Sequence, residues 1–214
     1  MNVIICGSEG KTGSKVYQLL KENSINIVGC VNEHKTSLKE LLKLDIPIDY
    51  VIDFTIKDVA YNHILQCIEN NISFICGTTG FNKEELNNIK QLLKDKPISG
   101  IICPNFSIPL NCLIKEFNTI SQNFDKLTIL EQHHKSKKDK PSGTGKLLNS
   151  LSCCKSNIIS LDSEDYIIYY RIQFESKCDK MIITYQVDDK TAYAKGVLYY
   201  LQSNKKDLFV NLIW

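Results

Sequence analysis

The chain has 214 residues, of which 43% are hydrophobic and 23% charged, and its formal net charge is +2. This charge excludes a strong electrostatic attraction to nucleic acid or to a membrane surface, and the composition is that of a globular protein with one or two domains. No apolar run approaches membrane-spanning length, and the nine cysteines are scattered. We therefore expect reduced thiols and a cytoplasmic protein.

The N-terminal segment has a glycine-rich turn between an expected strand and an expected helix. The strand covers residues 2–6, the turn reads Gly7-x-x-Gly10-x-x-Gly13, and the helix runs from 11 to about 22. A second strand over 25–31 ends near Glu33, where an acidic side chain meets the ribose hydroxyls of NAD. The pattern predicts a dinucleotide site, with a turn that binds no ligand as the alternative. A P-loop is excluded, because Ile5 stands where that motif needs glycine.

Strands and helices alternate up to residue 107. Further strands are expected over 49–54, 72–76 and 98–103, and helices over 38–44, 57–70 and 82–94. This alternation predicts a parallel sheet with helices on both faces, and ligands bind such a sheet at the carboxyl ends of its strands. We expect one rim there, formed by the glycine-rich turn, Glu33, Thr55, Gly77–Thr79 and Pro104–Phe106.

The pattern changes after residue 107. A helix is expected over 109–121, a strand over 126–132, and an antiparallel hairpin from 166–174 and 181–187. These elements suggest a second, α+β domain. A last helix over 191–201 is expected to return to the first domain. We therefore predict a discontinuous dinucleotide-binding domain of residues 1–106 and 191–214, and a second domain of residues 107–190.

The loop Glu131–Gly145 holds the densest group of polar residues, and it ends in Pro-Ser-Gly-Thr. Ser142 is a natural N-cap for the helix that follows. The backbone N–H groups of Gly143 and Thr144 would then point along the positive end of the helix dipole, a place that binds carboxylate or phosphate. Four lysines within six positions add positive charge. The expected ligand is a small anion with more than one carboxylate.

Two adjacent histidines, His133 and His134, open the same loop and can move protons near neutral pH. The alternatives are a buried and an exposed histidine without chemical importance, and lysines that are simply solvated. No cysteine or histidine stands at metal-ligand spacing here, so we expect no metal.

Four landmarks carry a resemblance to a known family: Gly7-x-x-Gly-x-x-Gly13, Gly77-Thr-Thr-Gly-Phe81, Asn105-Phe-Ser107 with Asn111, and Glu131-x-His-His-x-x-Lys-x-Asp-x-Pro-Ser-Gly-Thr144. With them the chain resembles the dihydrodipicolinate reductases, also called 4-hydroxy-tetrahydrodipicolinate reductases, of diaminopimelate and lysine biosynthesis. The resemblance covers essentially the whole chain, and it is weakest between Leu151 and Lys190.

The resemblance implies an α/β Rossmann-type domain that binds NADH or NADPH, and a smaller α+β domain that binds the dicarboxylate substrate and builds a homotetramer. The implied reaction is the reduction of 4-hydroxy-tetrahydrodipicolinate to tetrahydrodipicolinate. His133 would be the acid/base and Lys137 the catalytic lysine, and the substrate would meet His134, Ser142, Gly143 and Thr144. The expected cofactor residues are Gly7, Ser8, Glu9, Gly10, Lys11, Thr12, Glu33, Gly77, Thr78, Thr79, Cys103, Pro104, Asn105 and Phe106.

The chain departs from the family pattern by being shorter. The segment between Glu33 and Asp49 is trimmed. Between Leu151 and Tyr166 the Gly- and Arg-rich strand region of the family is absent, which would weaken or alter the tetramer. Glu33 favours NADH, and His34 would still tolerate NADPH. Two other functions stay open: a trimmed, non-catalytic dinucleotide-binding protein, and a reductase of another small dicarboxylate.

Overall fold

A computed structural model describes residues 1–33, 36–137 and 139–202, so His34 and the last twelve residues lie outside the described part. The chain divides into two compact units. The first joins Met1–Ile108 to the segment that begins at Lys190, and the second is Pro109–Asp189. None of the described helices combines the length and the apolar character needed to cross a membrane.

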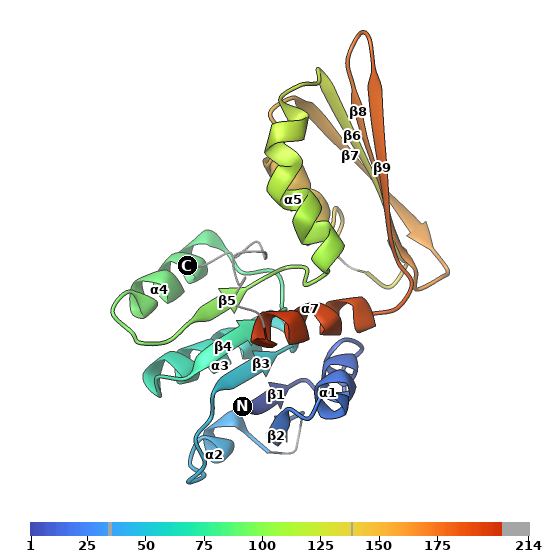
Figure 1. The fold of residues 1–214 in the computed structure, drawn as a ribbon. Helices are drawn as coiled ribbons and strands as arrows, with labels where there is room; N and C mark the ends of the chain where they lie inside the picture. Colours follow the sequence, from blue (N-terminus) through green and yellow to red (C-terminus); the bar gives the residue numbers. More distant parts are fainter. Residues whose placement is uncertain (34–35, 138, 203–214) are drawn as a thin grey trace. The chain divides into compact units, whose positions relative to one another are not determined.

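The first unit contains a parallel sheet of five strands in the order β2-β1-β3-β4-β5 (Figure 1). The strands are β1 (Asn2–Cys6), β2 (Asn26–Val31), β3 (Tyr50–Asp53), β4 (Ser73–Cys76) and β5 (Gly100–Ile102). The chain moves from β1 to one neighbour and then crosses to the other, which creates a switch point at the carboxyl end of β1. The predicted Rossmann-type sheet is confirmed, and its switch point is where such sheets bind ligands.

Helices pack on both faces of this sheet, because successive side chains of a strand point to opposite sides. On one face Val3 and Ile5 of β1 pack with α1 (Gly13–Glu22) and α7 (Thr191–Gln202). On the other face Ile4 and Cys6 pack with α3 (Lys57–Glu69) and α4 (Lys83–Leu93), and the short α2 (Leu38–Leu41) lies near the sheet edge. Asn82 caps α4 through a capping box with Glu85.

Helix α7 belongs to the first unit. It packs on α1, and Gly196 lies against the backbone after β5. A Cβ on Gly196 would stand 1.7 Å from the carbonyl oxygen of Phe106, so only glycine allows this approach.

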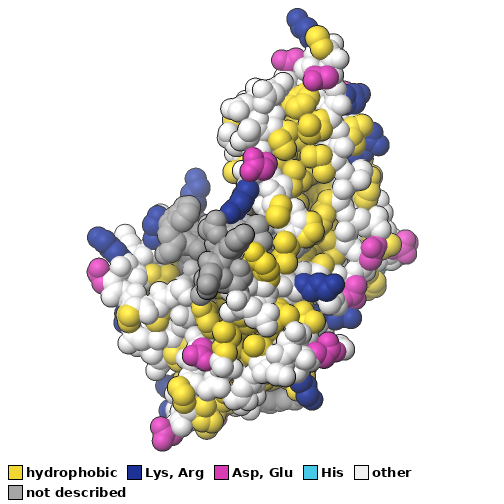
Figure 2. All heavy atoms as spheres, viewed as in Figure 1, with side chains coloured by type: hydrophobic (Ala, Val, Ile, Leu, Met, Phe, Trp, Pro, Cys, Tyr) yellow, Lys and Arg dark blue, Asp and Glu magenta, His cyan; other side chains and the backbone are white. Residues whose placement is uncertain are grey.

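The second unit has a four-stranded sheet in the order β7-β6-β8-β9. It comprises β6 (Lys126–His134), β7 (Lys155–Ser163), β8 (Ile168–Glu175) and β9 (Lys180–Val187). Both of its helices, α5 (Ile108–Ser121) and α6 (Gly143–Ser150), pack on one face: the Phe117 ring of α5 lies 5.3 Å from Phe174, and Gly145 of α6 lies against Glu131. Figure 2 shows hydrophobic side chains exposed along this sheet beside α5.

Strand β7 lies between Leu151 and Tyr166, where the sequence predicted no strand; it contains neither glycine nor arginine. It pairs in parallel with β6, so β6, α6 and β7 form a crossover unit in which α6 is the connecting helix. The sequence reading missed it because β7 is an edge strand in which serine, asparagine and aspartate interrupt the apolar residues.

Candidate functional site

The glycine-rich turn after β1 is closed tightly. Gly7 has a φ of +78°, in the left-handed region, and the Gly10 N–H donates to the Gly7 carbonyl at 3.0 Å. A Cβ on Gly13 would stand 2.0 Å from that same carbonyl oxygen. Glycines at both positions therefore let the chain turn directly from β1 into the N-terminus of α1.

Asn32 ties this turn to the end of β2. Its side-chain oxygen accepts from the Ser8 hydroxyl at 3.0 Å and from the Glu9 N–H at 3.3 Å. The Gly7 N–H donates to the Val31 carbonyl at 2.8 Å. Asn32 is a residue that sequence reasoning missed, although its place directly after a strand of the rim was a usable signal.

A cavity of about 440 Å³ opens at the carboxyl ends of the strands. Its lining contains five of the predicted cofactor residues, which are Lys11, Thr12, Gly77, Thr78 and Thr79. The segment after β3 supplies the rest of the lining, with Phe54, Thr55, Ile56 and Lys57. The volume lies within the usual range for small-molecule sites. The structure therefore brings the predicted turn after β4 and the start of α1 to one cavity.

The lining of this cavity is polar and basic, which fits the phosphates and hydroxyls of a dinucleotide. Lys57 carries an ammonium group at the cavity, and Glu85 and Asp58 pair with it at 2.8 and 2.9 Å. The hydrogen bonds from the Lys57 ammonium to Glu85 and Asp58 raise the pKa of Lys57, so it stays charged. The hydroxyls of Thr12 and Thr79 add further polar groups to the lining, and phosphate oxygens accept from such donors.

The predicted residues after β5 stand apart from this lining. The Cys103 thiol is buried, donates to the Asn105 carbonyl at 3.1 Å, and has its pKa raised to about 12 by burial. The Asn105 side chain accepts from the Ser107 N–H at 2.9 Å, and the buried Phe106 ring lies 6.1 Å from Phe54. These side chains shape the loop from within. Gly7–Gly10, Glu33 and Pro104 are also outside the cavity lining, at the neighbouring strand ends.

In the second unit, strand alternation places Glu131 and His133 on the helix-covered face of β6. Glu131 is fully buried and stands between Ser160 of β7 and Tyr170 of β8 in the strand register. A buried carboxylate must be hydrogen-bonded. It accepts from the Ser142 N–H at 2.7 Å, the Ser160 hydroxyl at 2.8 Å and the Ser142 hydroxyl at 2.5 Å.

Ser142 is the N-cap of α6, as predicted, and accepts from the Gly145 N–H at 2.9 Å. Its hydroxyl therefore both donates to Glu131 and accepts from the helix. Glu131 holds the cap in place, and α6 presents its first turn, with Gly143 and Thr144, beside His133. Sequence reasoning included Glu131 in the motif but assigned it no task, and it missed Ser160.

A chain of hydrogen bonds connects this carboxylate to the imidazole of His133. The Tyr170 hydroxyl lies 3.0 Å from the Ser142 hydroxyl and 3.2 Å from His133 Nε2. Burial raises the pKa of Tyr170, so the phenol keeps its proton. Burial also lowers the pKa of His133, which outweighs the opposite effect of the Glu131 carboxylate. A protonated His133 can donate to Tyr170, Tyr170 to Ser142, and Ser142 to Glu131.

The other two predicted groups of the loop contact their own neighbours. His134 stacks on Tyr166 with ring centroids 4.0 Å apart, and its Nδ1 lies 2.7 Å from the Ser136 hydroxyl. Lys137 pairs with Asp139 at 2.8 Å. Alternation along β6 directs His134 to the sheet face opposite His133.

A parallel sheet with a glycine-rich first turn and a polar cavity at its strand ends defines a Rossmann-type dinucleotide-binding unit. Comparison with known families assigns both units of the chain to one family. Residues 1–106 match "Dihydrodipicolinate reductase, N-terminus" and residues 110–211 match "Dihydrodipicolinate reductase, C-terminus". The chain belongs to the dihydrodipicolinate reductase family.

Curated relatives agree with this assignment. The 4-hydroxy-tetrahydrodipicolinate reductase of Oceanobacillus iheyensis is 33% identical over 68% of this chain and 63% of its own length. That of Streptococcus thermophilus is 34% identical over 67% of this chain and 60% of its own length. The chain thus spans somewhat less than two thirds of the length of these two curated relatives.

Solved structures share the fold. The dipicolinate-bound dihydrodipicolinate reductase of Paenisporosarcina sp. TG-14 has a TM-score of 0.74 and 20% identity, covering 93% of this chain and 92% of that one. Aspartate dehydrogenase of Thermotoga maritima has a TM-score of 0.59 and 13% identity, covering 95% of this chain and 97% of that one.

Proposed function

We propose that this protein is an NAD(P)H-dependent reductase that converts 4-hydroxy-tetrahydrodipicolinate to tetrahydrodipicolinate in diaminopimelate and lysine biosynthesis. One observation carries the proposal: in a chain of this family, a capped helix N-terminus lies beside a histidine that is hydrogen-bonded through Tyr170 and Ser142 to a buried carboxylate. A binding protein without chemistry has no physical need for that arrangement.

The first unit would hold the cofactor, and Lys11, Thr12 and Thr79 of the cavity lining would donate to its polar groups. The reduced nicotinamide supplies the hydride when it is bound. Glu33 supports NADH as the slightly preferred cofactor, because its carboxylate would accept from the free ribose hydroxyls.

The second unit would bind the dicarboxylate substrate. One carboxylate would accept from the N–H groups of Gly143 and Thr144, with Lys137 adding positive charge. His134 is directed to the opposite sheet face, so it takes no part in this contact. The Ser142 hydroxyl donates to Glu131 and accepts from the Gly145 N–H. Because the hydroxyl is engaged in this way, we assign Ser142 a positioning role.

His133 would give a proton to the substrate. Its lowered pKa favours a neutral imidazole in the free protein. Two substrate carboxylates beside it would raise that pKa, so substrate binding itself would load the proton donor.

Assembly into a homo-oligomer, a tetramer by family resemblance, is supported by the sheet face of the second unit opposite α5 and α6. Ile159, Leu161 and Ile182 are about 40% exposed there, and no helix of the described part of this unit covers them. All nine cysteines are unpaired, which supports a reducing compartment such as the cytoplasm.

The test is oxidation of NADH and of NADPH with substrate generated in place from pyruvate and aspartate semialdehyde by a coupled synthase. Oxidation that depends on the synthase product is expected. A folded protein that binds NADH and turns over only another dicarboxylate would move the assignment to that substrate. Binding without any turnover would leave a dinucleotide-binding protein.

His133→Ala is expected to lower kcat by roughly 10²- to 10⁴-fold, the usual effect of losing a positioned acid/base. The Kd of NADH should stay unchanged, because His133 belongs to the second unit. Thr128→Ala, on the opposite face of the same strand, is the matched control. Wild-type turnover by His133→Ala would remove this residue from the reaction.

A further inference from the structure

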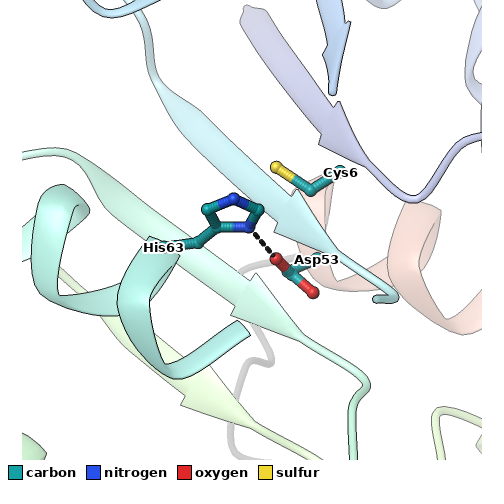
Figure 3. Close-up of side chains that lie close together, drawn as sticks. All are labelled: Cys6, Asp53 and His63. Carbon is teal, nitrogen blue, oxygen red and sulfur yellow. Dashed lines mark hydrogen bonds and ion pairs between the residues drawn. The ribbon is translucent and has the colours of Figure 1, made fainter. Parts of the chain in front are cut away.

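A cluster of Cys6, Asp53 and His63 lies buried beneath the cofactor cavity and has no part in the function proposed above (Figure 3). Cys6 ends β1, Asp53 ends β3, and His63 comes from the middle of α3. Their ligand atoms all lie within 4.8 Å of one another, which is close enough to suggest a metal site. Asp53 is only 2% exposed, so its carboxylate requires partners.

The distances favour a hydrogen bond over a metal. His63 Nδ1 and Asp53 Oδ2 are 2.6 Å apart. Nitrogen and oxygen ligands on one zinc ion stand about 3.3 Å apart, given bonds of about 2.0 Å in tetrahedral geometry. Burial also raises the pKa of Cys6, and the negative charge of Asp53 raises it further, so the thiol keeps its proton. We therefore take Asp53 and His63 as a directly bonded pair.

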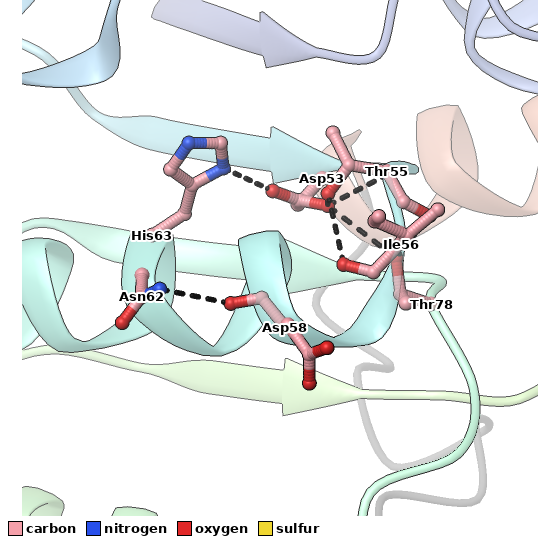
Figure 4. A network of polar contacts seen from close by, with 7 residues as sticks. All are labelled: Asp53, Thr55, Ile56, Asp58, Asn62, His63 and Thr78. Atoms are coloured by element: carbon pink, nitrogen blue, oxygen red, sulfur yellow. Dashed lines mark hydrogen bonds and ion pairs between the residues drawn. The ribbon is translucent and has the colours of Figure 1, made fainter.

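The second carboxylate oxygen of Asp53 points toward Thr55 and Thr78 (Figure 4). It accepts from the Thr55 N–H at 2.8 Å and from the Thr55 hydroxyl at 2.7 Å. The Thr78 hydroxyl lies 3.4 Å from the same oxygen and 3.1 Å from the Thr55 carbonyl, and its single proton serves one of them at a time. One buried carboxylate thus connects the turns after β3 and β4 to α3.

Thr55 and Thr78 both line the cavity, and Asp53 stands directly behind them. The orientation of the Thr55 and Thr78 hydroxyls therefore depends on the Asp53 carboxylate, although a ligand in the cavity need not contact Asp53 itself. The orientation of that carboxylate depends in turn on the bond from His63, because its two oxygens are shared between the histidine and the threonines.

We propose that Asp53 and His63 are positioning residues for dinucleotide binding, which hold Thr55 and Thr78 at the cavity wall. The proposal rests on the function proposed above, since it takes the dinucleotide as the ligand. It assigns a task to two residues that are remote from the reacting groups.

Two substitutions at His63 separate the hydrogen bond from the bulk of the ring. His63→Asn can place an amide N–H near the position of Nδ1, whereas His63→Leu fills similar space without a donor. The Kd of NADH, measured by titration without substrate, should rise about tenfold in His63→Leu and stay within about threefold of wild type in His63→Asn. In turnover, His63→Leu should raise the KM of the cofactor while kcat at saturating cofactor changes less.

A folded His63→Leu protein with unchanged Kd and KM would overturn the proposal. Asp53→Asn gives a second test that does not depend on that variant: the amide oxygen can keep both bonds from Thr55, and the amide N–H can donate to His63 in its other tautomer. Its Kd should stay within about threefold. A tenfold weaker affinity for NADH in Asp53→Asn, with the thermal stability of wild type, would contradict a positioning role based on geometry. Wild-type protein that binds neither NADH nor NADPH would instead contradict the proposed function itself.

Discussion

At the scale of single residues, the bond between Tyr170 and His133 sets how readily the imidazole keeps a proton. A protonated Nε2 can donate to the Tyr170 hydroxyl, 3.2 Å away. Tyr170→Phe deletes this acceptor, which lowers the pKa of His133 further than burial already does. If His133 is the proton donor, kcat/KM falls as pH rises through its pKa. The fall of kcat/KM with rising pH should therefore begin at a lower pH in the variant than in wild type, and kcat/KM at neutral pH should be about tenfold lower.

The matched control for this prediction is Tyr169→Phe, which removes a hydroxyl from the next residue of β8 on the other side of the sheet. Its pH profile should follow that of wild type. NMR titration of the His133 imidazole gives a readout that does not require turnover. An unchanged His133 titration in Tyr170→Phe would show that the hydroxyl does not influence the proton.

Residues whose role follows from local sequence could be predicted, and those whose role follows from packing could not. Ser142 as an N-cap follows from Pro-Ser-Gly-Thr, and the glycine-rich turn follows from its spacing. Glu131 could not be assigned, because its hydrogen-bond partner Ser160 and its cross-strand neighbour Tyr170 are brought to it by the strand register. The same holds for Asp53, which meets a histidine ten residues away only once α3 packs on the sheet.

At the scale of elements, α7 depends on one glycine for its place in the first unit. Gly196→Ala would drive a Cβ into the Phe106 carbonyl, 1.7 Å away, and a backbone atom cannot move aside cheaply. The free energy of unfolding should fall by about 1–3 kcal/mol, the usual cost of overpacking. Urea denaturation measures it.

Lys195→Ala is the control for this substitution. It adds a good helix former at an exposed position of the same helix, and the unfolding free energy should stay within about 0.5 kcal/mol of wild type. Equal stability of Gly196→Ala and wild type would mean that α7 can shift away from the loop after β5.

Element prediction succeeded where the apolar pattern was continuous and failed where it was interrupted. The central strands β1, β3 and β4 of the first unit are buried on both sides and appear as mainly apolar runs. Strand β7 lies at a sheet edge with partly exposed residues along its length, and its parallel partner is reached only through α6. Its pairing is a property of the whole second unit, which no local window of sequence contains.

At the scale of the whole molecule, the open sheet face is where we expect the interface of the proposed homo-oligomer. Leu161 is 43% exposed and stands next to Ile159 on that face. A lysine there would have to be desolvated in any interface formed by the face. Leu161→Lys should therefore reduce the mass measured by light scattering to that of a smaller assembly. The same mass as wild type would place the interface elsewhere.

Asp165→Lys is the control for assembly, because it introduces the same side chain at an exposed bend outside the strands. Its mass should equal that of wild type. Reduced turnover together with reduced mass in Leu161→Lys alone would show that assembly supports the reaction.

The buried and the exposed cysteines lie in different units, so alkylation of the buried thiols can report the unfolding of the first unit. The buried thiols Cys6, Cys67, Cys76 and Cys103 all belong to the first unit, whereas the exposed ones, Cys112, Cys153 and Cys178, belong to the second. Burial raises the pKa of the four buried thiols, and alkylation requires the thiolate. An alkylating reagent should thus mark the exposed thiols of the second unit at once, and these four buried thiols of the first unit only when that unit unfolds; the half-buried Cys30 is left out of the readout. Mass spectrometry over time would time that unfolding, and a dinucleotide that binds the first unit should delay it.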